Sequence, residues 1–146
     1  MSVAEPKPIP EEILKDSVLL HLAAAYSSVG KRLEQKTGCS QTRGFVMSTL
    51  RGGGELNQNQ IATILGLDRT VVHRVIKTLV REGLLAEKKA PTGRAILLRL
   101  TAEGNRYRER LIRERRAADE KLAQKLTQEE RAALIGLLKT VAALEL

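Results

Sequence analysis

The sequence is poor in the residues that hold small secreted or metal-bound proteins together. Its single cysteine, Cys39, cannot form a disulfide within the chain and fits a reducing compartment. The two histidines, His21 and His73, form no cluster with metal-ligand spacing, and the three glycines at 52–54 lack the Lys-Ser/Thr of a phosphate-binding loop. We therefore expect no metal, no cofactor and no enzymatic activity.

Long apolar runs are also missing. No stretch reaches the roughly eighteen apolar residues of a membrane span, and the N-terminus carries Glu5, Lys7 and Pro8 where a signal peptide would be apolar. These absences predict a cytoplasmic protein without a membrane partner. Aromatic residues make up only 2% of the chain, so aliphatic residues must fill the core. The length and composition favour one mostly helical structural domain.

The charge that is present lies mainly in the middle of the chain. The formal net charge is +8, and residues 40–100 alone hold ten Lys and Arg against four Asp and Glu. Such an excess favours a polyanionic partner, because nucleic-acid-binding proteins use cationic side chains to neutralise phosphates.

The N-terminal third predicts a flexible arm and a long helix. Residues 1–10 contain three prolines and little apolar material, which indicates an arm. From residue 11 to about Gly38, apolar residues recur at steps of three and four, which predicts one amphipathic helix. Ser40 is placed to cap a second helix, which the glycines at 52–54 end. The apolar stripe of the first helix is Leu14, Val18, Leu22, Ala25, Val29 and Leu33.

Two short helices follow, with clear start and stop signals. Asn57 and Gln60 have the spacing of a capping box, and Gly66 ends that helix. Asp68 is placed to cap the next helix, which Gly83 ends. Two short helices joined by a tight turn are typical of a helix-turn-helix, whose second helix can enter the DNA major groove.

The remainder predicts a hairpin and two helices. Residues 84–89 and 95–100 are strand-compatible and flank a Pro- and Gly-containing tip, which makes the hairpin a wing. Thr101 opens a long charged helix, and Thr127 with Glu130 forms a capping box before a strongly apolar last helix. The fold class is therefore mostly α with a small β-hairpin wing, a winged helix-turn-helix.

The outward face of the second helix of the helix-turn-helix is basic. A basic helix face is more often simply solvated, but this one lies in the most positive segment and precedes a hairpin with further cations. DNA contact is therefore the better interpretation. The outward residues are Thr70, His73, Arg74, Lys77 and Arg81, and the hairpin cations are Lys88, Lys89, Arg94 and Arg99.

Residues 60–85, QIATILGLDRTVVHRVIKTLVREGLL, resemble the winged-helix core of the MarR family of transcriptional regulators. The segment Leu100-Thr101-Ala102-Glu103-Gly104 after the hairpin and Gly38-Cys39-Ser40 before the second helix resemble the family too. The likeness thus covers nearly all of the chain after the arm.

The resemblance implies a homodimer whose residues 11–39 and 101–146 form dimerisation helices, with residues 40–100 as the DNA-binding lobe. It implies a sequence-specific regulator, more commonly a repressor, that binds a pseudopalindromic promoter site on double-stranded DNA and is released by a small-molecule or redox effector. The implied contacts are Arg69, Thr70, Val71, His73, Arg74 and Lys77 on the recognition helix, with Lys88, Lys89 and Arg94 on the wing.

Within that set, Arg74 is expected to contact guanine, because a guanidinium can donate to both O6 and N7. Arg94 is expected to reach the minor groove. The family usually shows Asp-x-Arg in the wing, where this chain reads Thr92-Gly93-Arg94, so the side chain that would position Arg94 is missing.

Three other interpretations stay open from sequence. Cys39 occupies a position usually taken by an aliphatic residue, so packing is favoured over a redox role. His21 and Tyr26 would either line an effector pocket or pack in a core or interface, and the second is the commoner role. A winged helix can also bind protein or RNA, although the basic outward face favours DNA phosphates.

Overall fold

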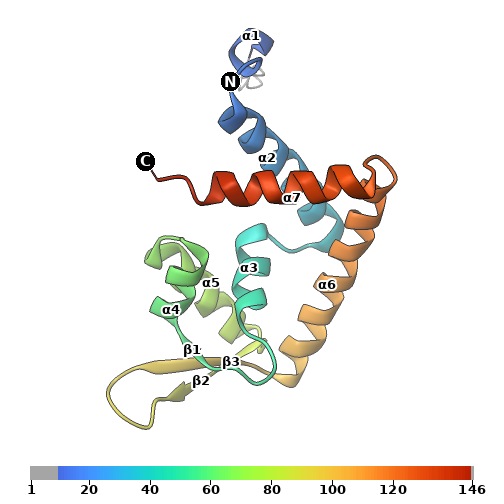
Figure 1. Cartoon of the computed structure of the whole chain (residues 1–146). Coiled ribbons are helices and arrows are strands. Elements are labelled where there is room, and N and C mark those ends of the chain that lie inside the picture. The colour runs from blue at the N-terminus through green and yellow to red at the C-terminus, as the bar shows by residue number, and fades with distance from the viewer. Residues whose placement is uncertain (1–9, 146) are drawn as a thin grey trace, which may run out of the picture. The chain divides into compact units, whose positions relative to one another are not determined.

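The computed structural model describes residues 10–145 (Figure 1). Apart from Pro10, the arm expected at residues 1–10 lies outside the described residues. The chain forms two compact units, one up to Ser40 and one from Gln41 onward. No helix in the described part is long and apolar enough to cross a bilayer.

The first unit contains two helices, α1 (Glu11–Leu14) and α2 (Val18–Thr37). The prediction of one continuous helix from residue 11 was wrong, because the chain leaves the helix before Ser17. The Ser17 hydroxyl accepts a hydrogen bond from the Leu20 amide at 3.2 Å and caps a new helix there. The predicted end is confirmed, since Gly38 closes α2 in the left-handed conformation.

The second unit begins with three helices, α3 (Gln41–Thr49), α4 (Gln58–Leu65) and α5 (Arg69–Arg81). The predicted capping box of α4 is formed by Asn57 and Gln60, each side chain bonding the other's amide at 2.9 Å. Gly66 ends α4 with φ 61°, and the turn to Asp68 is short enough to make α4 and α5 a helix-turn-helix.

A small antiparallel sheet follows, with strand order β1-β3-β2. Strands β2 (Leu85–Lys89) and β3 (Ile96–Leu100) form the predicted hairpin, which projects from the unit in Figure 1. The two-residue strand β1 (Leu56–Asn57) was not predicted, since it exists only through its pairing with β3.

Two further helices, α6 (Ala102–Ala123) and α7 (Gln128–Ala142), complete the second unit. Thr101 caps α6, and Thr127 with Glu130 forms the predicted capping box of α7. Helix α6 leads away from the sheet, and α7 begins at its far end (Figure 1).

An aliphatic core holds α3, α4, α5 and the sheet together. The predicted core side chains of α5 are buried in it, except that Val75 is only partly buried. Because this core is shared by all three helices and the hairpin, it sets the position of α5 relative to the wing. Its buried members are Val46, Met47, Leu50, Ile61, Ala62, Val72, Ile76, Leu79, Leu84, Leu85 and Leu98.

Candidate nucleic-acid interface

The outward face of α5 is exposed as the sequence predicts. Arg74 and Lys77 are one turn apart on this face, and His73 precedes them. Val71 is also exposed, at 40%, so an apolar contact is available beside the polar ones. The remaining predicted residues of the helix, Arg69 and Thr70, are exposed in its first turn.

The N-terminus of α5 is fixed by Asp68. Its carboxylate oxygen Oδ1 accepts a hydrogen bond from the Thr70 amide at 2.7 Å. The Thr70 amide, together with the Thr70 hydroxyl and the Val71 amide, holds the pKa of Asp68 below its usual value. The first turn of α5 is therefore closed by a carboxylate that stays ionised at neutral pH.

Gln58, a residue that sequence reasoning missed, connects the start of α4 to α5. Its side-chain Oε1 lies 2.8 Å from Nδ1 of His73, and its Nε2 donates to the Arg69 carbonyl at 3.3 Å. One side chain thus contacts two residues of the exposed α5 surface. The only sign of this role in the sequence is that a polar residue stands in the first turn of α4.

The C-terminal end of α5 is tied to α3 and α6. Arg43 of α3 forms an ion pair with Glu82, the residue that ends α5, and its Nε donates to the Tyr107 hydroxyl at 3.3 Å. The hydrogen bond from Arg43 holds the pKa of Glu82 below its usual value. The Arg43 and Arg110 guanidinium groups also lie over the Tyr107 ring, 5.4 and 5.1 Å from its centroid.

The start of α6 is packed tightly against the segment after α5. The Thr101 hydroxyl donates to the Gly83 carbonyl at 2.7 Å, and the Thr101 amide donates to the Leu84 carbonyl at 3.1 Å. A Cβ on Gly104 would lie only 2.0 Å from the Leu84 carbonyl oxygen. The Leu-Thr-x-x-Gly segment therefore has a packing reason: Thr101 caps the helix and Gly104 permits the close approach.

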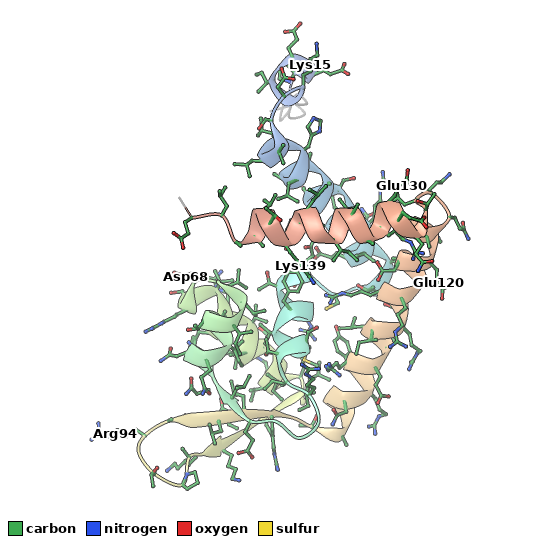
Figure 2. All side chains as sticks on the ribbon, in the orientation of Figure 1. Lys15, Asp68, Arg94, Glu120, Glu130 and Lys139 are labelled. Carbon is green, nitrogen blue, oxygen red and sulfur yellow. The ribbon has the colours of Figure 1, made fainter. Side chains whose placement is uncertain are left out.

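The wing carries its cations in different surroundings. Lys88 pairs with Glu55 at 3.4 Å, whereas Lys89 is exposed at the end of β2. Arg94 lies in the loop between β2 and β3 and points away from the rest of the unit (Figure 2). Among the described residues, its side chain has no hydrogen-bond or ion-pair partner.

An open cleft of about 310 Å³ lies where the end of the hairpin loop and the start of β3 meet the start of α4. Its lining is Asn57, Gln58 and Asn59 from one side and Arg94, Ala95 and Ile96 from the other. The helix-turn-helix and the wing thus share one open concavity with polar side chains on the α4 side.

The candidates in the first unit have different exposures. The Cys39 thiol is buried, 6% exposed, and donates to the Ser40 carbonyl at 3.4 Å. His21 and Tyr26 both lie on α2 and are exposed, Tyr26 at 54%. Burial of the thiol fits the packing role, because a redox-sensing thiolate needs access to its oxidant.

The known proteins that this chain resembles are regulators of transcription. Residues 44–96 match the family model described as MarR family. The chain is 27% identical to the HTH-type transcriptional regulator YdgJ of Bacillus subtilis (strain 168), over 83% of this chain and 74% of that protein.

Solved structures with the same fold include two transcriptional regulators. The PcaV transcriptional regulator of Streptomyces coelicolor, in complex with its natural ligand, has a TM-score of 0.73 at 27% identity, covering 94% of this chain and 97% of that one. The transcriptional repressor CouR, bound to a 23-mer DNA duplex, has a TM-score of 0.81 at 23% identity, covering 93% and 99%.

The α4–α5 pair and the hairpin make a winged helix-turn-helix, and the outward face of α5 is basic, as in regulators of transcription that bind DNA. The chain is similar to regulators of the MarR family, whose family model matches its residues 44–96. This family is not a class of enzymes.

Proposed function

We propose that the protein binds a specific sequence of double-stranded DNA as a homodimer, with α5 of each copy in the major groove. The observation that carries the proposal is the exposed cationic face of α5, which is held at both ends by Asp68 and by the Arg43–Glu82 pair. A recognition helix fixed in this way loses little conformational entropy when it binds DNA. It therefore suits the reading of base edges.

The exposed side chains of α5 differ in the part of DNA that each can contact. Arg74 can donate two hydrogen bonds to O6 and N7 of guanine. Val71 can contact a thymine methyl group, and Lys77 can neutralise a phosphate. Arg69 and Thr70, in the first turn, are placed with them for backbone or base contacts.

The wing adds contacts to the sugar-phosphate backbone. Arg94 points away from the unit, and we assign it to the minor groove beside the site of α5. Lys89 and Lys88 lie farther back along β2 and are assigned to phosphates, with Lys88 first having to leave Glu55.

Dimerisation is supported by apolar surface on both units. Helix α7 exposes Leu134, Ile135, Leu137 and Leu138, and α2 exposes Val18, Leu19 and Val29. Exposed apolar side chains on each of these helices are typical of protein interfaces, and a second copy would cover them. Two copies would place two α5 helices on half-sites about one helical turn apart.

Repression with release by an effector is the regulatory mode that we propose. A repressor in this family need only occlude a promoter, and an effector that prefers a different spacing of the two lobes would weaken binding. His21 and Tyr26 are the proposed effector contacts, because both are exposed on the dimerisation helix α2. Cys39 is assigned to packing.

The direct test is duplex binding at several salt concentrations. We expect the wild type to bind with a steep salt dependence. The Arg74→Ala, Lys77→Ala double variant should lose most binding, with a logarithmic salt slope smaller by about one, because Lys77 is the phosphate contact of the two. The control is Arg113→Ala, Arg116→Ala, which removes the same charge from exposed positions of α6. Binding to duplex RNA in place of DNA, or no salt-sensitive binding, would contradict the proposal.

A further inference from the structure

We infer that Gln58 holds His73 as the Nδ1–H tautomer, so that His73 presents Nε2 as a hydrogen-bond acceptor and selects an amino-bearing base. The base-selecting part of this inference rests on the proposed binding of α5 in the major groove. The tautomer does not, because it follows from contacts inside the protein.

The direction of each hydrogen bond follows from elementary chemistry. The Arg69 carbonyl oxygen can only accept, and it has two lone pairs, so the Gln58 group that faces it must be the amide NH₂. The amide oxygen must then face His73, where Oε1 lies 2.8 Å from Nδ1. Since an amide oxygen can only accept, Nδ1 of His73 must carry the proton.

The consequence appears on the other side of the ring. When a neutral imidazole carries its proton on Nδ1, Nε2 has a free lone pair and accepts. Nε2 makes no hydrogen bond to any residue in the described range, and His73 is exposed between Thr70 and Lys77 on the proposed recognition face.

An acceptor at this place favours some bases over others. In the major groove, cytosine N4 and adenine N6 are donors, whereas guanine and thymine present O6, N7 and O4 as acceptors. His73 would therefore favour cytosine or adenine at its position, and Arg74 would favour guanine beside it. Gln58 acts as a positioning residue, since it sets the tautomer without having to touch DNA.

The tautomer can be measured without DNA by ¹⁵N NMR of the imidazole rings, and only two histidines have to be assigned. At about pH 8.5, above the range in which histidines ordinarily gain a proton, we expect Nδ1 of His73 to be protonated and Nε2 to be bare. Gln58→Leu should shift His73 toward Nε2–H, whereas Gln58→Glu should keep Nδ1–H because a carboxylate still accepts. Thr63→Val, on the exposed side of the same helix, is the control and should change nothing.

Base selection is then measured on a duplex that carries each of the four base pairs at every position of the bound site. We expect one position where the wild type prefers cytosine or adenine by roughly fivefold, the value of about one neutral hydrogen bond. His73→Ala and Gln58→Leu should both flatten that preference and leave the salt slope unchanged, because neither removes a formal charge.

Two results would overturn the inference. An Nε2–H tautomer in the wild type would remove its basis, even if DNA binds as proposed. An unchanged base preference in His73→Ala would leave Gln58 with a purely structural role between α4 and α5. If the protein binds no DNA but His73 carries its proton on Nδ1, the proposed function fails and only the tautomer stands.

Discussion

Helices α5 and α7 both carry aliphatic side chains at helical spacing, but they differ in what covers them. In α5, Val72 and Leu79 are fully buried against α3, α4 and the sheet. In α7, Ile135 is 56% exposed and Leu137 is 64% exposed. Helix α5 is thus positioned by its own unit, whereas α7 has an apolar face that its own unit does not cover.

This difference separates the two tasks of the chain. A helix held by its own core can present a fixed polar face, which recognition of DNA requires. When a partner covers an exposed apolar face, each large aliphatic side chain that is half exposed contributes roughly 1 kcal/mol. Folding of the lobe and assembly of the proposed dimer should therefore be separable by mutation.

The largest expected effect is on the folding of the lobe itself. Gly104→Ala would place a Cβ 2.0 Å from the Leu84 carbonyl oxygen. Because this oxygen belongs to the backbone, it can move away only at a large cost in free energy. We expect a loss of about 1–3 kcal/mol in the free energy of unfolding, as for other overpacked sites. Gly136→Ala in α7 is the control, because nothing lies within 4 Å of its Cβ position. Equal stability of the two variants in urea would contradict the packing described for Gly104.

The next largest effect is expected on the assembly of two copies of the chain. Leu137→Glu places a charge in the face that we assign to the partner copy, so we expect dimers to dissociate at micromolar concentration while the unit keeps its helix content. Binding to the two-half-site DNA should fall by roughly 100-fold, because the copies no longer bind as one. Light scattering after size exclusion measures the mass. Lys139→Gln, which lowers the net charge by the same one unit, is the control. A dimeric Leu137→Glu protein would place the interface elsewhere.

A smaller effect with a defined pH dependence is expected from the Arg43–Glu82 pair. Because Arg43 lowers the pKa of Glu82 in the folded state, the pair stabilises the fold above the ordinary Glu pKa, and this contribution is lost as the pH falls through the lowered value. Glu82 is partly exposed, so Glu82→Gln should cost only about 1 kcal/mol at neutral pH. The difference from the wild type should disappear in acid, whereas Glu87→Gln should show none at either pH.

The smallest effect is expected at the cap of α5. Asp68→Ala removes the acceptor for the Thr70 amide, so amide hydrogen exchange in the first turn of α5 should accelerate while the rest of the helix is unchanged. Asp68→Asn keeps an acceptor and should behave like the wild type. Uniform acceleration along α5 would mean that Asp68 stabilises more than the first turn.

Much of the fold could be predicted because its signals are local. The capping pairs at Asn57 and Thr127 and the stop at Gly66 involve residues three or four apart, so sequence shows them directly. The break before Ser17 was not predicted, because the apolar stripe continues through it. A single hydroxyl group, that of Ser17, determines where the helix begins again. Strand β1 was not predicted, because its two residues form a strand only through pairing with β3.

The site could be predicted in part for the same reason. The exposed cationic face of α5 follows from helical spacing alone. The contacts that position this helix do not, because Gln58 lies 15 residues from His73 and Arg43 lies 39 residues from Glu82. Such partners are brought together only by the packing of α3 and α4 against α5.

The most direct test of the account is selection of binding sites from a random duplex pool, followed by footprinting of the wild type on the selected DNA. We predict one pseudopalindromic consensus with two protected half-sites whose centres lie about one helical turn apart. Loss of the second protected half-site in Leu137→Glu would link it to the dimer. A pool with no common sequence, or a single half-site bound equally well by wild type and Arg74→Ala, Lys77→Ala, would contradict recognition of DNA by α5.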